Sequence, residues 1–354
     1  MPSLRTASRR QLTLFVAVSG VLAAAVAAVL LPVPYVILGP GPTLNTLGKG
    51  PGGRPLILIT GHPIFPTVGH LNLVTVSFQG GPSDSLNVFA ALRAWLTPHE
   101  AVVPEEELFG PGQTQQQVVQ QDTQQMANSQ ETATAAALCV LGIRFRVVDT
   151  VTAAAKGLPA HGVLQRGDVI TAVDGKPVTC KADAATLIRA RAPGAPVTLT
   201  IARTEGGRRV TKQFHIKTAA IAGHAVVGVQ ISESYVFPFD VRIRVGDIGG
   251  PSAGLMFALG IVDKLTPGNL TGGRFVAGTG EISADGAVSA IGGIQQKMAG
   301  ARQAGATIFL TPAANCADTA GAVPAGMRLV KVSTLGGAVS ALEALKAGRS
   351  VPSC

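Results

Sequence analysis

A long uncharged apolar segment near the N-terminus constrains this chain more than any other feature. Between Leu12 and Val33 the sequence has no charged residue. A helix of roughly 22 residues, rising about 1.5 Å per residue, is long enough to cross the hydrocarbon core of a bilayer. We therefore predict a transmembrane helix over residues 12–33, preceded by a short tail of residues 1–11.

The charges around this segment predict its orientation. Arg5, Arg9 and Arg10 precede it, and the next basic residue is Lys49. Positively charged flanks remain in the cytoplasm. The tail is therefore expected in the cytoplasm, and everything after the helix outside it. A cleaved signal peptide is the alternative, because small-residue cleavage sites occur within Ala23–Ala28.

The remaining composition is that of folded domains. The 354 residues are 47% hydrophobic and only 14% charged, which excludes a disordered, highly charged chain. This length suggests about two or three domains. The net charge is +9, but the basic residues are scattered rather than interleaved with aromatics. No nucleic-acid partner is therefore expected.

The chain has four cysteines, and no two of them form a CxxC pair, so a zinc ribbon is not expected. An even number in an exported chain permits disulfides. A bond between Cys316 and Cys354 would tie down the C-terminus, and one between Cys139 and Cys180 would lie within one predicted domain. The sequence does not choose among the possible pairings, and buried free thiols are the alternative.

Residues 34–137 are predicted as a segment outside the membrane. Tyr35–Gly53 is rich in Pro and Gly and is expected to be a linker. Strands are predicted at Leu56–Thr60 and Leu71–Phe78, and a short helix at Asn87–Leu96. Gln113–Leu138 lacks Pro and Gly, so it is predicted as a helix, with a polar surface or spacer role.

Residues 138–218 show a different pattern. Leu141-Gly142-Ile143 opens a predicted strand, and the run from Leu164 through Gly-Asp168 to Asp174-Gly predicts a turn, a strand and a tight turn. These motifs resemble a PDZ domain. The resemblance implies that an extended peptide adds to a sheet edge, and that the N–H groups of Leu141, Gly142 and Ile143 bind its terminal carboxylate. A purely structural groove is the alternative.

A glycine-rich segment precedes a predicted apolar helix at residues 251–264. In Gly250-Pro251-Ser252-Ala-Gly, Pro251 suits the first helical position. Ser252 would then lie in the first turn, where free N–H groups near Gly250–Ser252 can stabilise an oxyanion. The alternative is that Ser252 only caps the helix.

The same segment fits the Gly-x-Ser-x-Gly elbow of α/β-hydrolases. That fold needs a histidine after the serine, and none of the six histidines follows Ser252. An upstream histidine in another triad order remains open.

Lys297 is the candidate base among the lysines that follow Ser252. No other charged residue occurs between Asp285 and Arg302, and an apolar setting lowers the pKa of a lysine. To act near neutral pH, its pKa must fall from about 10.4 to about 7, at a cost of roughly 4 kcal/mol. An ordinary surface lysine on an amphipathic helix is the alternative.

Three motifs follow one another along the chain. They are Gly-Pro-Ser252-Ala-Gly, Thr279-Gly-Glu-Ile and Ile291-Gly-Gly-Ile-x-x-Lys297. In order and spacing they resemble the proteolytic domain of Lon proteases. With the predicted membrane helix and the PDZ motifs, the chain resembles the YlbL-like family of membrane-anchored PDZ–Lon proteases. The resemblance implies that Ser252 is the nucleophile, that Lys297 is its general base, and that Thr279 helps to orient the lysine.

The chain departs from the Lon pattern in two places. Gly249 stands where Lon often has an Asp, and the chain has no Gly-x-x-x-x-Gly-Lys-Ser/Thr phosphate loop. The substrates implied are therefore flexible segments, exposed tails or unfolded proteins, cleaved without ATP. No cofactor and no metal are expected, and His62 and His70 have no carboxylate or Cys cluster nearby.

Alternating strands and helices over residues 219–354 predict an α/β or α+β layered domain, within a multidomain α+β chain. The strands at residues 56–78 are expected to complete its sheet, which would make the PDZ domain an insertion. The function predicted is a membrane-anchored, ATP-independent serine endopeptidase. The alternative is an inactive membrane-anchored PDZ scaffold, and homo-oligomerisation is left open.

Overall fold

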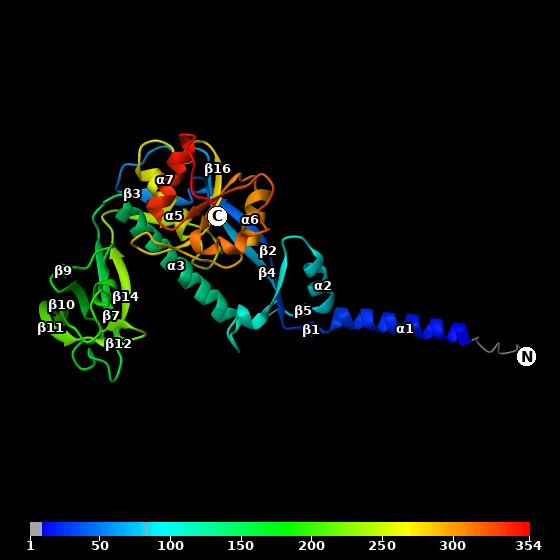
Figure 1. Ribbon diagram of the computed structural model, residues 1–354, viewed down its shortest axis with the longest axis horizontal. Helices are drawn as coiled ribbons and strands as arrows, with labels where there is room; N and C mark the ends of the chain where they lie inside the picture. The colour runs from blue at the N-terminus through cyan, green and yellow to red at the C-terminus, as the bar shows by residue number, and fades with distance from the viewer. Residues whose placement is uncertain (1–8, 83) are drawn as a thin grey trace, which may run out of the picture.

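A single exposed helix extends from the body of the molecule at its N-terminal end (Figure 1). The computed structural model describes residues 9–82 and 84–354, so residues 1–8 of the predicted tail, including Arg5, lie outside the described residues. Helix α1 (Arg9–Leu30) contains an apolar stretch long enough to cross a membrane. It ends before the predicted Val33, because proline cannot continue a helix and prolines follow at 32 and 34.

A six-stranded sheet forms the centre of the body, in the order β20-β19-β16-β4-β2-β6. Four neighbouring strands, β4, β16, β19 and β20, are parallel, whereas β2 is antiparallel to both β4 and β6. The six strands are β2 (Tyr35–Asn45), β4 (His70–Gln79), β6 (Ala101–Pro104), β16 (Phe275–Gly278), β19 (Ile308–Pro312) and β20 (Arg328–Val332). Strands that precede and follow residues 146–236 thus share one sheet, so that region is an insertion.

Strand β2 corrects the prediction that Tyr35–Gly53 is a linker. Its Pro and Gly residues lie where the register with β4 shifts, between Pro40 and Thr43. Irregular positions of this kind tolerate proline, which cannot donate to a ladder. Gly41 is required there, because a Cβ at this position would lie 2.3 Å from the Oγ1 of Thr75.

Helices cover both faces of this sheet. On one face, α3 (Gln115–Val140), α5 (Gly254–Leu265) and α7 (Leu335–Lys346) pack on Leu71 and Leu73. On the other face, α6 (Ile294–Gln303) packs on Val74 and Ala277. Alternate residues of a strand therefore enter opposite cores, as strand geometry requires. The layered, mixed α/β class predicted from the sequence is confirmed.

Helix α3 forms where it was predicted, but its role is not that of a polar spacer. Its first half carries most of the exposed glutamines, whereas Ala133 to Cys139 are buried in the main core. Small alanine side chains let α3 approach α5 closely. The helix is thus a structural part of the domain.

Smaller elements complete the body. Two short strands, β1 (Pro32–Val33) and β5 (Leu86–Asn87), pair just before α2 (Val88–Leu96). The other pairs are β3 (Ile57–Thr60) with β15 (Asp240–Ile243), and β17 (Glu281–Ile282) with β18 (Val288–Ser289). The 3₁₀ turns are at Pro51–Gly53, Glu105–Glu107, Ala313–Asn315 and Ala317–Thr319.

The inserted region is a second domain with its own core. Its sheet has the order β11-β10-β8-β7-β14, with β9 paired to β8. The elements are β7 (Arg146–Ala154), β8 (Val169–Val173), β9 (Lys176–Pro177), α4 (Ala184–Arg189), β10 (Pro196–Glu205), β11 (Arg208–Lys217) and β14 (Val229–Val236), with a hairpin of β12 (Ala219–Ile221) and β13 (His224–Val226). The domain extends past the predicted boundary at residue 218, because β14 pairs with β7 along its whole length.

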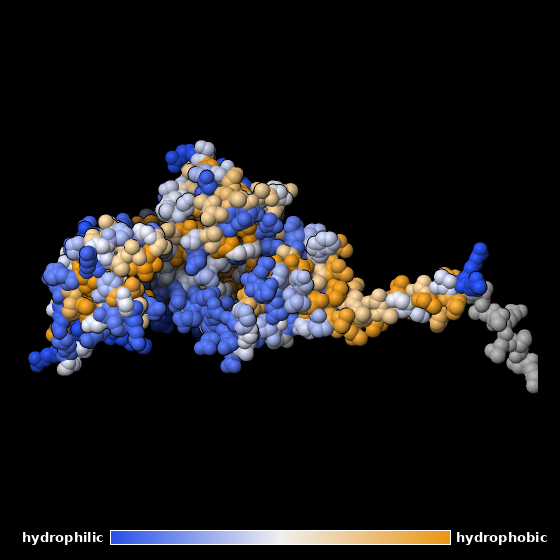
Figure 2. Space-filling model, turned by 60° about the horizontal axis from the view of Figure 1, so that its bottom comes forward, coloured by the Kyte–Doolittle hydropathy of each residue, from blue (hydrophilic) through white to orange (hydrophobic). Residues whose placement is uncertain are grey.

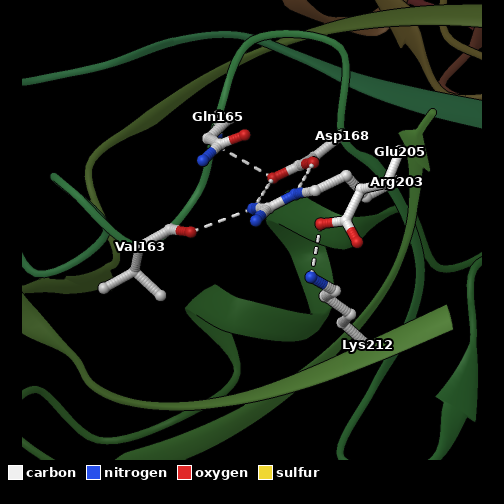
Figure 3. A network of polar contacts seen from close by, with 6 residues as sticks. All are labelled: Val163, Gln165, Asp168, Arg203, Glu205 and Lys212. Carbon is white, nitrogen blue, oxygen red and sulfur yellow. Dashed lines mark hydrogen bonds and ion pairs between the residues drawn. The ribbon is translucent and has the colours of Figure 1, made fainter. Parts of the chain in front are cut away.

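A buried ion pair explains the Gly-Asp motif of this domain (Figure 3). Arg203 donates to both carboxylate oxygens of Asp168 at 2.7 Å, and to the carbonyl of Val163 at 3.0 Å. The N–H of Gln165 donates to the same carboxylate. Burial opposes ionisation of Asp168, but these hydrogen bonds outweigh it and keep its pKa below the usual value.

Two disulfides join separate parts of the structure. Cys139, at the end of α3, is bonded to Cys180 of the inserted domain, and Cys316 is bonded to Cys354 at the C-terminus. The first bond does not lie within one domain, contrary to the expectation. It links the helix that packs on α5 to the inserted domain.

Removing the bond between Cys139 and Cys180 tests this link. We expect the double Cys→Ser variant to lose about 2–4 kcal/mol of stability, because the bond closes a long loop in the unfolded chain. Thermal unfolding followed by circular dichroism measures the loss. The Cys316→Ser, Cys354→Ser variant removes a disulfide that closes a loop of similar length, and it is the matched control. Only the variant without the Cys139–Cys180 bond is expected to lose the inserted domain to limited proteolysis. Equal protease resistance of the two variants would contradict the role of this bond in joining α3 to the inserted domain.

Candidate active site

Ser252 lies in a turn just before α5, held by the end of β16. Helix α5 begins at Gly254, later than the predicted start at residue 251. The carbonyl of Ser252 accepts hydrogen bonds from the N–H of Gly280 at 2.8 Å and from the Oγ1 of Thr279 at 2.9 Å. Gly254 is needed in this turn, since a Cβ there would lie 2.8 Å from Ile282. The backbone of the serine is therefore fixed in place.

Lys297 reaches the serine from the opposite layer of the domain. It lies in the first turns of α6, and its Nζ is 3.0 Å from the Oγ of Ser252. The preceding Gly293 has a φ of 68°, and a Cβ there would lie 2.6 Å from Val76. The Ile-Gly-Gly-Ile motif thus allows α6 to begin close against β4.

Burial makes this lysine a weak base that can act near neutral pH. Its side chain is only 4% exposed, and this burial lowers its pKa to about 8. A lysine with such a pKa is neutral in a useful fraction of molecules near neutral pH. It can then accept a proton from a hydroxyl within hydrogen-bond reach.

Thr279 connects the two residues. Its Oγ1 lies 3.3 Å from the Nζ of Lys297 and donates to the carbonyl of Ser252. The threonine is fully buried. The structure therefore brings together all three residues named from the sequence, Ser252, Lys297 and Thr279.

The expected oxyanion role of Gly250 and Pro251 is not supported. The N–H of Gly250 donates to the carbonyl of Asp122 at 3.1 Å, and proline has no N–H. In the described part of the chain, the N–H groups of Ser252 and Ala253 make no hydrogen bond. These two groups are the donors available for an oxyanion.

Two residues of α3 were missed by the sequence analysis. A Cβ on Gly249 would lie 2.6 Å from the Cβ of Asp122, so Asp122 fills the space beside the glycine where Lon often has an acid. Burial raises the pKa of Asp122. Ser129 donates to the carbonyl of Pro251 at 2.9 Å. A single Asp within the Gln-rich run was the available signal.

A cleft of about 1350 Å³ opens beside the Ser–Lys pair. The first half of α3 forms one wall, the loop before Ser252 forms a second, and residues 290–293 form a third. Apolar side chains of β2 and β4 line its far end, including Leu38, Val76 and Phe78. The cleft is larger than a typical small-molecule pocket.

The loop predicted to bind a peptide carboxylate is not free to do so. The N–H groups of Leu141, Gly142 and Ile143 donate to carbonyls of α3, namely Ala137, Cys139 and Leu138. They form the cap of that helix. The prediction for this loop is therefore wrong. The two end strands of the inserted sheet are β11 and β14, and the outer edge of β14 pairs with no strand in the described ranges.

The two histidines considered as a metal pair have separate surroundings. His70 stacks on Phe275 with the ring centroids 4.4 Å apart, and His62 packs on Phe239. Each ring thus packs against a phenylalanine.

The lowered pKa of Lys297 predicts a stability effect. Between pH values of about 8 and 10.5 the unfolded chain binds a proton that the folded protein does not, so this residue makes stability rise with pH across that window. Below about pH 8 its full cost applies. Lys297→Met should therefore raise the free energy of unfolding at pH 7 by up to about 3 kcal/mol, and by much less near pH 10.5.

Urea unfolding at the two pH values measures this difference. Ser252→Ala is the control, because it removes no buried charge. A Lys297→Met protein that is no more stable than the parent at pH 7 would show that burial of the lysine carries no such cost.

Comparisons with known proteins agree with the geometry. Residues 226–342 match the family model of the Lon protease (S16) C-terminal proteolytic domain, and residues 150–203 match that of the PDZ domain. Among curated relatives, Lon protease 2 of Herpetosiphon aurantiacus is 42% identical over 83 residues, which are 22% of this chain and 10% of that protein. Lon protease of Clostridioides difficile is 43% identical over 67 residues, 18% of this chain and 8% of that protein. The chain thus spans about a tenth of the length of these relatives.

Among solved structures, two PDZ domains of SdrC-like proteins are similar to part of this chain. That of Listeria monocytogenes is 26% identical and covers 23% of this chain and 85% of its own, with a TM-score of 0.21. That of Listeria innocua is 25% identical and covers 24% and 92%, with a TM-score of 0.20. Residues 226–342 thus resemble the proteolytic domain of Lon-type (S16) serine peptidases, and residues 150–203 resemble a PDZ domain.

Proposed function

We propose that this protein is a membrane-anchored serine endopeptidase that cleaves flexible or unfolded protein segments without ATP. The observation that carries the proposal is the buried Nζ of Lys297, 3.0 Å from the Oγ of Ser252. A serine beside a base of lowered pKa is the requirement for nucleophilic acyl transfer.

The chemistry follows from these positions. Neutral Lys297 takes the proton of Ser252 as its Oγ attacks the peptide carbonyl carbon. The oxyanion that forms is stabilised by the N–H groups of Ser252 and Ala253. Lys297 then gives the proton to the leaving amine. A water molecule, deprotonated by the same lysine, hydrolyses the acyl-enzyme and restores the serine.

The walls of the cleft suit an extended peptide rather than a folded domain. Glutamines of α3 and apolar side chains of β2 and β4 line it together with charges of both signs, from Asp122, Arg244, Asp247 and Glu281. Such a lining contacts backbone and side chains without demanding one charge. The chain itself contains no phosphate-loop motif, which supports cleavage of segments that need no unfolding.

We assign delivery of substrate to the PDZ domain through strand β14. Its free edge can take an added peptide strand. The N–H of Tyr235, near the end of β14, already donates to the carboxylate of Glu131 on α3 at 3.2 Å. Helix α3 also lines the cleft beside Ser252, so a peptide bound along β14 lies next to a helix of the cleft wall.

The membrane anchor is helix α1. Its apolar stretch is exposed and long enough to span, and Arg9 and Arg10 stand at its first turn. These charges favour a cytoplasmic N-terminus. Two disulfides fit a catalytic part that lies outside the reducing cytoplasm.

The first test is loss of cleavage. Ser252→Ala and Lys297→Ala should each lower the cleavage rate of an unfolded protein such as reduced casein by at least about a thousandfold, since each removes a partner of the proton transfer. Lys264→Ala, a partly buried lysine on α5, is the matched control and should retain activity. Circular dichroism checks that the variants are folded.

The alternative function, an inactive PDZ scaffold, gives a different result. A folded parent protein that neither cleaves casein nor becomes covalently labelled at Ser252 by a serine-reactive phosphonate would establish the scaffold and exclude the peptidase.

The second test is the pH dependence. Because the neutral form of Lys297 is the base, kcat/KM should rise about tenfold per pH unit below the pKa and level off above about pH 8. Steady-state cleavage of a fluorogenic peptide between pH 6 and 10 measures the profile. A rate that is constant from pH 6 to 9 would exclude a lysine of this pKa as the base.

A further inference from the structure

The large apolar residues of helix α2 lie on its exposed side. Phe89, Leu92, Trp95 and Leu96 are 60%, 52%, 75% and 79% exposed. The buried side of the helix carries alanines instead, with Ala94 fully buried against Ile37 and Leu86. A surface helix in water normally shows the reverse arrangement.

The exposed residues form one continuous surface. Positions 89, 92 and 96 are spaced by three and four residues, so they share one face of the helix, and Trp95 borders them. We call these four residues the α2 apolar face. Asn87 caps the helix through its hydrogen bond to the N–H of Ala90, so the face is held on a defined helix.

The α2 apolar face lies next to the membrane helix. Strand β1, which follows α1 directly, pairs with β5, which leads directly into α2. Helices α1 and α2 also contact each other. Figure 2 shows apolar residues gathered where the long helix joins the body, continuous with those of the helix itself.

We propose that the α2 apolar face lies in the surface of the lipid bilayer, as a second attachment beside α1. The proposal rests on α1 being the membrane anchor. Its support is continuity, because the face begins where the spanning helix ends. Its composition fits as well. Tryptophan favours the interface between lipid and water. Arg93 on the same helix is half-exposed and lies 3.9 Å from Glu100.

A second attachment has a consequence for the enzyme. A single helix leaves the catalytic domain free to tilt and rotate about one point. Helix α2 packs on β2 and β6 at the edge of the central sheet. With α2 in the bilayer surface, the sheet and the cleft beside it keep one orientation relative to the membrane.

The chain offers a direct probe, since Trp95 is its only tryptophan. Full-length protein is reconstituted into phosphatidylcholine vesicles, with or without brominated acyl chains, and Trp emission is recorded on protein that floats with the vesicles. We expect blue-shifted emission and roughly twofold quenching by the brominated lipid, because an interfacial indole lies near the acyl chains.

The variant Phe89→Ser with Leu92→Ser keeps the tryptophan and disrupts the face. It should still float, because α1 is intact, but its emission should shift to the red and the quenching should fall. Both side chains are more than half exposed, so the fold should persist, and circular dichroism checks this. Ile221→Ser with Val323→Ser removes exposed apolar groups elsewhere and should leave the emission unchanged.

The outcomes separate the two proposals. Protein that floats without quenching would overturn the α2 contact alone. Protein that does not float would overturn the anchor and the α2 contact with it. Blue-shifted emission that bromine does not quench and that depends on the ratio of protein to lipid would place a second copy of the chain on this face, and would also overturn the contact.

Discussion

The contact between Lys297 and Ser252 is the interaction on which the rest of this structure depends. Ser252 lies in the turn just before α5 and Lys297 lies in the first turn of α6, and these two helices pack on opposite faces of one sheet. Their side chains meet just past the end of β16. Thr279, at the end of that strand, binds both of them. Open α/β sheets commonly place their sites at the carboxyl ends of parallel strands. The catalytic geometry is thus a product of the layer arrangement.

Burial of Lys297 in this contact lowers the stability of the fold while it favours the proposed chemistry. Burial of Lys297 costs free energy at neutral pH, yet the same burial lowers its pKa to about 8, as the proposed general base requires. The surrounding core is correspondingly large. Helices α3, α5 and α7 share one continuous apolar cluster with strands β3, β4, β16, β17, β19 and β20. This core holds the turn before α5, and the separate core on the other face of the sheet, which includes Ile294 and Met298, holds the start of α6.

Helix α3 connects the main domain to the PDZ domain through hydrogen bonds and a disulfide. At one end its backbone and side chains hold the loop before Ser252, through Asp122 and Ser129. At the other end it contacts the PDZ domain, through Glu131 and through the disulfide of Cys139. The N–H of Gly250 donates to this helix rather than to an oxyanion. Helix α3 thus contacts both the loop before Ser252 and the inserted domain.

Local sequence determined most elements and the identity of the three central residues. Apolar periodicity marked the long N-terminal helix and the strands, and Ser252, Thr279 and Lys297 stood in recognisable motifs. It could not show that Tyr35–Asn45 is a sheet strand, because its prolines are tolerated only at a register shift set by β4. Nor could it show that the amides of Gly250 and of Leu141–Ile143 are already bonded to α3. Periodicity reports which face of an element is buried. Which groups meet across elements distant in the chain is decided by packing, and only the tertiary structure contains that information.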